Sequence, residues 1–341
     1  MHGLRFLTLI FTLMMSTVAF AQPRTISKIV DKSTISQDDE TKIEKYAVGW
    51  AEQLQSTDAE ALEQARTKLI GPFEPDVRMT PYARSLYGKY LKQGFVPLLS
   101  KDNENEMAAV NALQILALLG TEQASGLLLK HADISTENRA TLRLWASVGL
   151  GTTFLTGALP ENRVERYAKL LSNFTNKESD WFVLARQFDS LASLQSIPNQ
   201  DRIQQDALEI LSFQLQTSSL VNLLNSINAS NETDLRAQAL PFILPSLLLQ
   251  LIEPSVPDQV KTETFETIVP PLITFVEYAA TNHSDEEDTF LHGAYGGGAH
   301  SASLLINRGL DSYGGEKVID LWNSGNYLAI LELVETWKAS Q

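Results

Sequence analysis

The chain contains no cysteine among its 341 residues. This absence excludes disulfide bonds, thiolate metal sites and cysteine nucleophiles. The fold must therefore be stabilised by core packing, and a chain of this length can bury a sizeable core. Two signature motifs are lacking as well: no Gly-x-Ser-x-Gly carries a serine nucleophile, and no Gly-Lys-Ser or Gly-Lys-Thr ends a phosphate-binding loop.

Basic residues are scarce in this sequence. It has 27 lysines and arginines against 41 aspartates and glutamates, which gives a formal net charge of −14 at pH 7. Such a surface repels nucleic-acid phosphates and anionic lipid head groups. We therefore expect no nucleic-acid partner, whereas cations or basic partners would be attracted.

Long apolar runs are rare, and the N-terminal one has the layout of a secretory signal peptide. A positively charged start precedes an apolar run over residues 6–18, and small residues follow at Ala19 and Ala21. This pattern predicts a signal peptide over residues 1–21, cleaved after Ala21, and export to the periplasm or the extracellular space. As a helix, residues 6–21 would span about 24 Å, less than the roughly 30 Å of a membrane's hydrocarbon core. No cysteine follows the run, so we expect no stable membrane anchor after cleavage.

Helical periodicity covers most of the remaining chain, and no alternating apolar and polar run is long enough to predict a sheet. Residues 22–41 are polar and predict a linker. The clearest helical stripe consists of alanine and leucine and ends at Gly120, after which Thr121 is placed to cap a second helix. Leu-Gly-Thr at 119–121 recurs at 150–152. Recurrent helix pairs predict an all-α protein with an α-solenoid over residues 42–195.

Part of this region resembles a known repeat family. Residues 112–124 read Ala-Leu-Gln-Ile-Leu-Ala-Leu-Leu-Gly-Thr-Glu-Gln-Ala, and three leucines follow at 127–129. This stretch resembles a HEAT-type repeat, in which an Ala/Leu-rich helix ends at glycine and a short polar turn leads into a second helix. The resemblance covers about residues 104–152 and is degenerate elsewhere. It implies a superhelical binding scaffold with no chemistry attached. An irregular helical bundle is the alternative, because any amphipathic helix pair produces this periodicity.

The C-terminal region, residues 196–341, is predicted to be helical but less regular. Its most distinctive part is a His/Gly-rich segment over residues 282–300, which we expect to be a loop. The helices expected on either side cover residues 200–226, 232–252, 262–280, 301–308, 315–323 and 327–339.

The expected loop 282–300 concentrates histidine beside an acidic run at 285–288. Histidine and carboxylate side chains are sufficient ligands for zinc or another divalent ion. Their spacing matches no metal motif, however, and the acidic run is equally typical of a solvated loop. We therefore predict no cofactor. The candidate metal ligands are His283, Asp285, His292 and His300.

The triple glycine at 296–298 has two interpretations. Ahead of the expected helix at 301–308, its backbone N–H groups could hold an anion. Alternatively it is a flexible hinge between helices. The candidate binding residues of this segment are His292, Tyr295, Gly296, Gly297, Gly298 and His300.

Three functions remain open from the sequence, and one of them is a structural envelope component with no discrete ligand. We favour an exported, non-catalytic helical-repeat scaffold that binds another protein through an extended surface. The alternative is an exported all-α hydrolase or lyase, directed at polysaccharide, in which Tyr295, His292 and His300 transfer protons; this rests on analogy of fold. No basic cluster is present to bind uronate. The five tryptophans are dispersed, and Trp145 shares a helical face with Leu142, which predicts a place in the core.

Overall fold

The computed structural model describes residues 25–341, apart from positions 75, 231 and 285. The predicted signal peptide, residues 1–21, lies outside the described residues, and so does Asp285. The described part of the chain is built from α-helices and short 3-10 turns, without any β-strand. The predicted all-α class is therefore confirmed.

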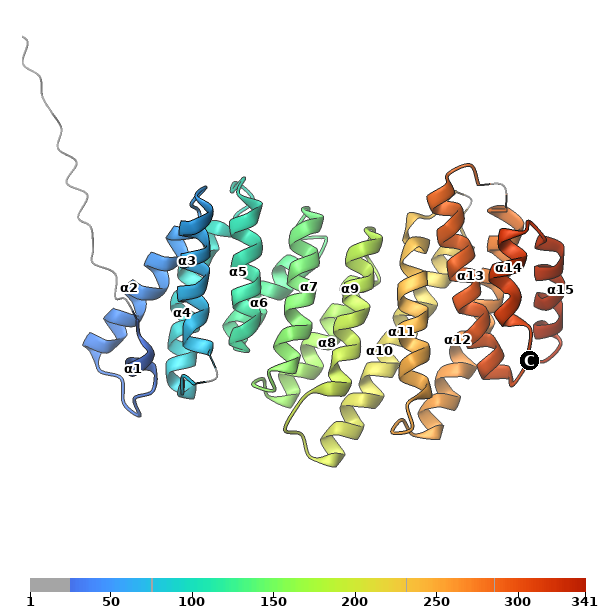
Figure 1. The fold of residues 1–341 in the computed structure, drawn as a ribbon. Coiled ribbons are helices and arrows are strands. Elements are labelled where there is room, and N and C mark those ends of the chain that lie inside the picture. Colours follow the sequence, from blue (N-terminus) through green and yellow to red (C-terminus); the bar gives the residue numbers. More distant parts are fainter. Residues whose placement is uncertain (1–24, 75, 231, 285) are drawn as a thin grey trace, which may run out of the picture.

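The helices follow one another along an elongated array in chain order (Figure 1). Short 3-10 helices lie at η1 (Gly71–Phe73), η2 (Ser193–Ser196), η3 (Leu235–Ala239) and η4 (Gly315–Lys317). The α-helices are α1 (Ser27–Val30), α2 (Gln37–Gln53), α3 (Ala59–Ile70), α4 (Pro81–Leu98), α5 (Glu106–Leu119), α6 (Glu122–Ala132), α7 (Ala140–Leu155), α8 (Glu161–Thr175), α9 (Trp181–Ala192), α10 (Arg202–Asn228), α11 (Leu240–Ile252), α12 (Asp258–Asn282), α13 (Thr289–Leu310), α14 (Val318–Asn323) and α15 (Tyr327–Lys338).

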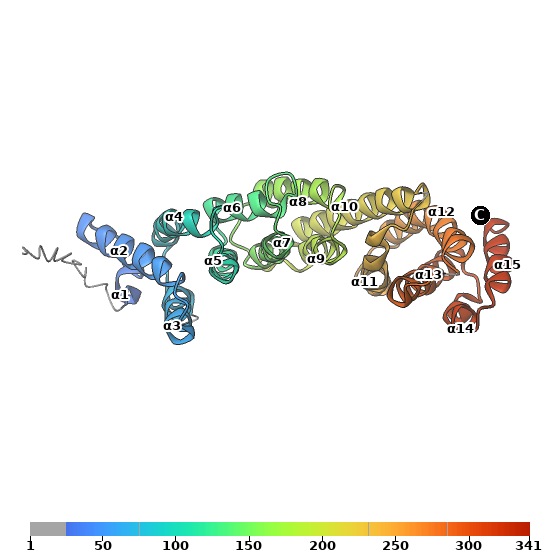
Figure 2. The same cartoon turned by 90° about the horizontal axis from the view of Figure 1, so that it is seen from above.

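From α4 to α13 the helices form two layers (Figure 2). Helices α4, α6, α8, α10 and α12 make up one layer, and α5, α7, α9, α11 and α13 make up the other. Successive helices run in alternate directions, so the helices within a layer are parallel, and each contacts the next member of its own layer. The array is gently curved, and its concave side is the side of α5, α7 and α9. We call the layer on that side the inner layer and the opposite one the outer layer.

Capping residues set the helix boundaries. Gly120 ends α5 with a φ of 58°, a left-handed conformation that favours glycine. Thr121 then begins α6 by accepting a hydrogen bond from the backbone N–H of Ala124 (3.4 Å), as the sequence predicts. Ser36 and Asp201 form reciprocal capping boxes at the starts of α2 and α10.

Buried apolar side chains form two core clusters, one from residues 26–208 and the other from residues 184–337. The clusters meet at α9 and α10, beside a network of glutamine side chains. The Oε1 atom of Gln250 accepts hydrogen bonds from Nε2 of Gln195 (2.6 Å) and from Nε2 of Gln216 (2.9 Å). A polar network thus lies where the two cores adjoin.

Two segment predictions are wrong. Residues 22–41, expected to be a linker, include α1 and the start of α2. Ile26 and Val30 are buried there, because a spacing of four residues places both on one edge of a helical turn. Residues 289–300, expected to belong to a loop, form the first half of α13, which leaves only 283–288 as the connection.

Candidate functional site

The residues singled out in the His/Gly-rich segment are spread along α12 and α13. His283 follows the last residue of α12, and the other described candidates lie between His292 and His300 of α13. Among the residues that the structure describes, no three His, Asp or Glu side chains converge on one point that could hold a metal ion.

Within the triple glycine of α13, Gly296 and Gly298 allow close packing against neighbouring helices. A Cβ atom on Gly296 would lie 2.5 Å from Nε1 of Trp322 on α14. A Cβ on Gly297 would meet Pro241 at 3.4 Å, and one on Gly298 would meet Phe275 at 3.2 Å. All three residues lie inside a continuous helix that begins at its Asp288 cap. This geometry favours a packing role, because the backbone N–H groups of a helix interior are bonded to carbonyls of the preceding turn.

His292 connects α13 to the two helices that follow it. Its Nε2 lies 3.0 Å from the hydroxyl of Tyr327 on α15. Its Nδ1 accepts a hydrogen bond from the indole Nε1 of Trp322 (3.4 Å). Because Nδ1 is the acceptor, the ring proton of the neutral imidazole is on Nε2, which donates to Tyr327. Both ring nitrogens of His292 thus serve to hold the C-terminal helices.

Tyr295 and His283 form a stacked pair inside the second core cluster. Their ring centroids are 3.7 Å apart and their planes differ by 6°. The Tyr295 hydroxyl accepts a hydrogen bond from the backbone N–H of Asp234 (3.2 Å). Burial raises the pKa of the Tyr295 phenol well above its ordinary value. The side chain is fully buried, and its hydroxyl ties α13 to the backbone at Asp234.

A polar pocket of about 530 Å³ lies beside His283, between the ends of α10 and α12. Burial lowers the pKa of the imidazole, although Glu286 opposes the shift with an oxygen 3.5 Å from Nδ1. Other side chains that line the pocket include Asn228, Thr233 and Tyr278. The pocket brings one of the predicted residues, His283, next to polar groups, but the other described candidates do not line it.

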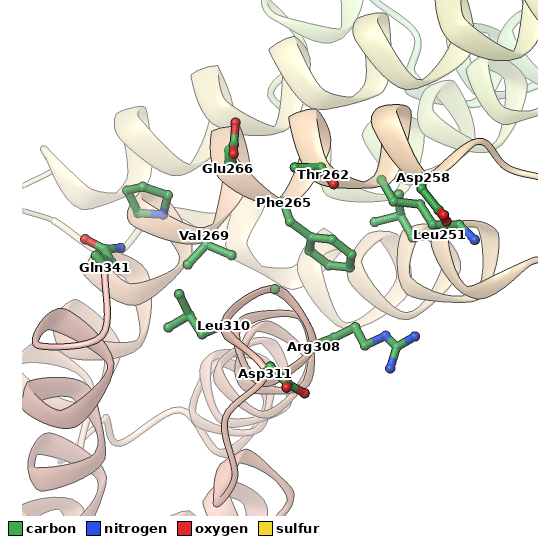
Figure 3. A pocket seen from close by; sticks show the side chains of 13 residues that line it. Leu251, Asp258, Thr262, Phe265, Glu266, Val269, Arg308, Leu310, Asp311 and Gln341 are labelled. Carbon is green, nitrogen blue, oxygen red and sulfur yellow. The ribbon is translucent and has the colours of Figure 1, made fainter.

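A cavity of about 610 Å³ lies between α12 and the end of α13 (Figure 3). Phe265 and Val269 of α12 and Leu310 of α13 line its apolar centre. The carboxylates of Glu266 and Asp311 point in opposite directions at its rim. A third carboxylate, that of Asp258, lines the same cavity together with Lys261 and Arg308.

A second concave feature lies on the inner layer, in the groove between the parallel helices α7 and α9. Its volume is about 490 Å³, and large apolar side chains line it. Trp145, predicted to be in the core, lines this groove and is only partly buried, whereas Leu142 is fully buried. The prediction is right in part, because Trp145 packs against the first core cluster and also lines the groove. Helix α7 is apolar on both faces, so periodicity alone does not tell its core side from its solvent side. The apolar residues of the groove are Leu144, Trp145, Val148, Leu155 and Phe182.

An aromatic cluster continues from this groove across the next two inner-layer helices. The ring of Trp181, at the start of α9, lies 5.2 Å from Phe182, 5.7 Å from Phe242 of α11 and 6.3 Å from Phe290 of α13. Phe182, Phe242 and Phe290 are 41%, 55% and 61% exposed. We call the groove and the cluster together the apolar strip: Leu144, Trp145, Val148, Leu155, Trp181, Phe182, Phe242 and Phe290.

Helix α11, which carries Phe242, is unusually apolar for a helix at a protein surface. The stretch Leu235–Ile252 is long and apolar enough to cross a membrane by length and composition, and 44% of it is buried in the fold. Core helices pass the same test. Its exposed part includes Leu249, two turns after Phe242 on the same face of the helix. A helix as apolar as α11 cannot bury all of its sides, so its sequence could have indicated an exposed apolar face.

Charge is distributed unequally between the two layers. In the groove, the charged side chains are Arg186 and Asp189, which pair with each other at 2.6 Å. The Arg186 guanidinium also lies over the Phe182 ring, 5.3 Å from its centroid. The outer layer is different, because the surface of α8 carries five charged residues: Glu161, Arg163, Glu165, Arg166 and Lys169.

Comparison of the chain with protein-family models, with curated proteins and with solved structures finds no match.

Proposed function

We propose that this protein is an exported scaffold, a degenerate α-solenoid of HEAT-like helix pairs, that binds another protein through the apolar strip. The observation that carries the proposal is the exposure of Phe182, Phe242 and Phe290 around Trp181 on three adjoining helices. Contiguous exposed apolar side chains of this kind mark interaction sites. Aromatic side chains are also the ones that dominate binding energy in protein interfaces.

The rigidity of the surrounding helices supports this role. Phe182 and Phe290 lie in the first turns of α9 and α13, which Asp180 and Asp288 cap, and Phe242 lies in the first turn of α11, next to Pro241. Side chains held on capped helices lose little conformational freedom on binding, so less of the contact energy is spent on ordering them.

The roles of the histidines favour a scaffold over an enzyme. His292 is engaged by Trp322 and Tyr327, and His283 is stacked on Tyr295 inside the core. Catalytic acids and bases must reach a substrate from a shared cleft. The candidate residues face different neighbours instead, which leaves the strip as the better supported site.

A photo-cross-linking experiment tests the proposal. A photoreactive amino acid is introduced at Leu155, in the strip, or at Lys169, on the outer layer, in cells that express the full chain. We expect a discrete adduct with one protein, recovered from the exported fraction, from position 155 and none from position 169. Equal adducts from both positions, or none from either, would reject the strip as a binding surface.

A further inference from the structure

We infer that the apolar strip accommodates an amphipathic α-helix whose polar side is basic. This inference rests on the proposed function, and it specifies the chemistry of the partner segment. Three observations carry it: the dimensions of the groove, the state of the polar groups in its floor, and the charge around it.

The groove has the shape that a helix requires. Leu144, Val148 and Leu155 lie along one side of α7 over about 11 residues, which is roughly 17 Å at the helical rise per residue. Phe182 and Ser193 mark the two ends of the facing side of α9. A partner helix of about three turns, with apolar residues at positions i, i+3 or i+4 and i+7, matches that length.

Small residues form the floor and allow α7 and α9 to approach. A Cβ atom on Gly151 of α7 would lie 2.9 Å from Oγ of Ser190 on α9. The groove therefore runs between two ridges of larger side chains, of which Trp145 and Phe182 are the bulkiest. Ridges packed into grooves are the general mode of contact between helices.

The polar groups of the floor are already satisfied within the fold. The Ser190 hydroxyl lies 2.7 Å from the carbonyl of Ser147 and 2.9 Å from that of Arg186. The hydroxyl of Thr152 donates to the carbonyl of Val148 in α7, and that of Ser193 donates to the carbonyl of Ser190 in α9. An extended peptide would bury unpaired backbone groups against such a floor, whereas a helix satisfies its own. The same argument disfavours sugars and other strongly polar ligands.

The charge around the strip determines which charge is favoured on the polar face of the partner helix. Within the groove Arg186 and Asp189 neutralise each other, so the contact surface itself favours apolar side chains. At the N-terminal ends of α9 and α13, Asp180 and the exposed Glu287 and Asp288 lie next to the aromatic cluster in the chain. The whole chain has a net charge of −14. Long-range attraction therefore favours a basic helix over an acidic one or an anionic membrane.

Synthetic peptides test this inference directly. The first probe is an 18-residue helix with leucine and phenylalanine on one face and lysine on the other; the second has glutamate in place of lysine, and the third is a scrambled form of the first. Binding to the full chain without its predicted leader is measured by fluorescence anisotropy. We expect the lysine peptide to bind at least tenfold more tightly than either of the others.

Two matched substitutions control the location. Leu155→Glu places a charge in the groove, and Ile203→Glu places one on an exposed apolar residue of α10 outside the strip. Both side chains are exposed, so both variants should fold, which circular dichroism checks. We expect Leu155→Glu to weaken binding of the lysine peptide by at least tenfold and Ile203→Glu to leave it unchanged.

Each other outcome rejects the inference in a distinguishable way. Equal binding of the lysine and glutamate peptides would reject a basic partner. Equal loss in both variants would place the peptide elsewhere. Binding of an apolar dye that Leu155→Glu abolishes, with no peptide bound, would identify the groove as a small-molecule site. If no peptide binds but position 155 still forms its protein adduct in cells, the helix inference fails while the proposed scaffold function stands.

Discussion

Arg143 and Glu178 form a two-point ion pair between successive helix pairs. The Arg143 Nε and Nη2 atoms each lie 2.8 Å from a carboxylate oxygen of Glu178, and the two side chains are only 5% and 1% exposed. Glu178 also accepts hydrogen bonds from the backbone N–H groups of Ser179 and Asp180 in the turn before α9. This pair therefore fixes the start of α7 to the turn that begins α9, and with it the width of the groove.

Loss of the Glu178 charge should destabilise the fold. In Glu178→Gln the buried Arg143 loses its counter-ion, and breaking a buried pair from one side costs about 3–5 kcal/mol. Urea unfolding at pH 7 measures the change in the free energy of unfolding. Asp189→Asn, which breaks the exposed pair with Arg186, is the matched control and should cost less than about 1 kcal/mol. Similar costs for the two variants would contradict the assignment of Glu178 as a buried connector.

The stability of the protein should decrease in acid partly because of Glu137. Burial alone would raise the pKa of this carboxyl, but hydrogen bonds from Arg139 and His131 outweigh it and lower the pKa to about 2. Because the folded pKa lies below the unfolded one, the stabilisation is complete above about pH 4.5 and is lost as the pH falls toward 2. The coupling between protonation and folding limits the contribution of Glu137 to the free energy of unfolding to about 3 kcal/mol.

Unfolding titrations at pH 7, 5 and 3 measure this effect. Glu137→Gln should reduce the difference in free energy of unfolding between pH 5 and pH 3, whereas Glu165→Gln, which removes a carboxylate from the exposed pair with Lys169, should leave it as in the wild type. A Glu137→Gln variant with the full wild-type pH dependence would count against the lowered pKa. His131 acts in the same direction at higher pH, because burial lowers its pKa and the folded protein resists its protonation as the pH falls below about 6.5.

Two glycines of α13 should respond to alanine in opposite ways. A Cβ on Gly296 would overlap the Trp322 indole, so Gly296→Ala should destabilise the protein by about 1–3 kcal/mol. Gly293 lies one turn earlier with no atom within 4 Å of its Cβ position, so Gly293→Ala should stabilise the helix by about 0.5–1 kcal/mol. Thermal unfolding measures both changes. If Gly296→Ala were also stabilising, the close packing of α13 on α14 would be wrong.

The glutamine network between the two core clusters should contribute to their coupling. Gln250→Leu removes the acceptor that Gln195 and Gln216 share, and each donor left unsatisfied costs about 1–3 kcal/mol. Gln259→Leu is a control on the exposed surface of α12 and should change stability by less than about 0.5 kcal/mol. Denaturant unfolding followed by circular dichroism compares the two. No difference between them would show that the network is dispensable.

Much of the fold could be predicted because its signals are local. The αL cap at Gly120 and the N-cap at Thr121 follow from residue types at adjacent positions, and so does the alanine and leucine stripe before them. The course of α13 was missed for the opposite reason. Its glycines predict a loop when considered alone, and only the contacts of Gly296 with Trp322 and of Gly298 with Phe275 explain why a helix tolerates them.

The candidate site shows the same division. The sequence drew attention to His283, His292 and Tyr295, because histidine and tyrosine are chemically conspicuous, but their partners lie up to 61 residues away in the chain. Composition could not predict whether each ring nitrogen of His292 would form a hydrogen bond with a neighbouring side chain or with solvent. The apolar strip was missed because tryptophan and phenylalanine, as at Trp145 and Phe242, are typical core residues and do not mark a site by their residue type.

Local sequence was thus enough for the all-α class, for the caps at Gly120 and Thr121 and for the acidic charge, because each depends on composition or on neighbours within a few residues. Only the packing of the helices established which side of α7 and α11 faces outward. A helix that is apolar all round carries no record of its buried face, and that choice depends on which other helices cover it. The apolar strip exists because the outer layer covers one side of these helices and leaves the other side open.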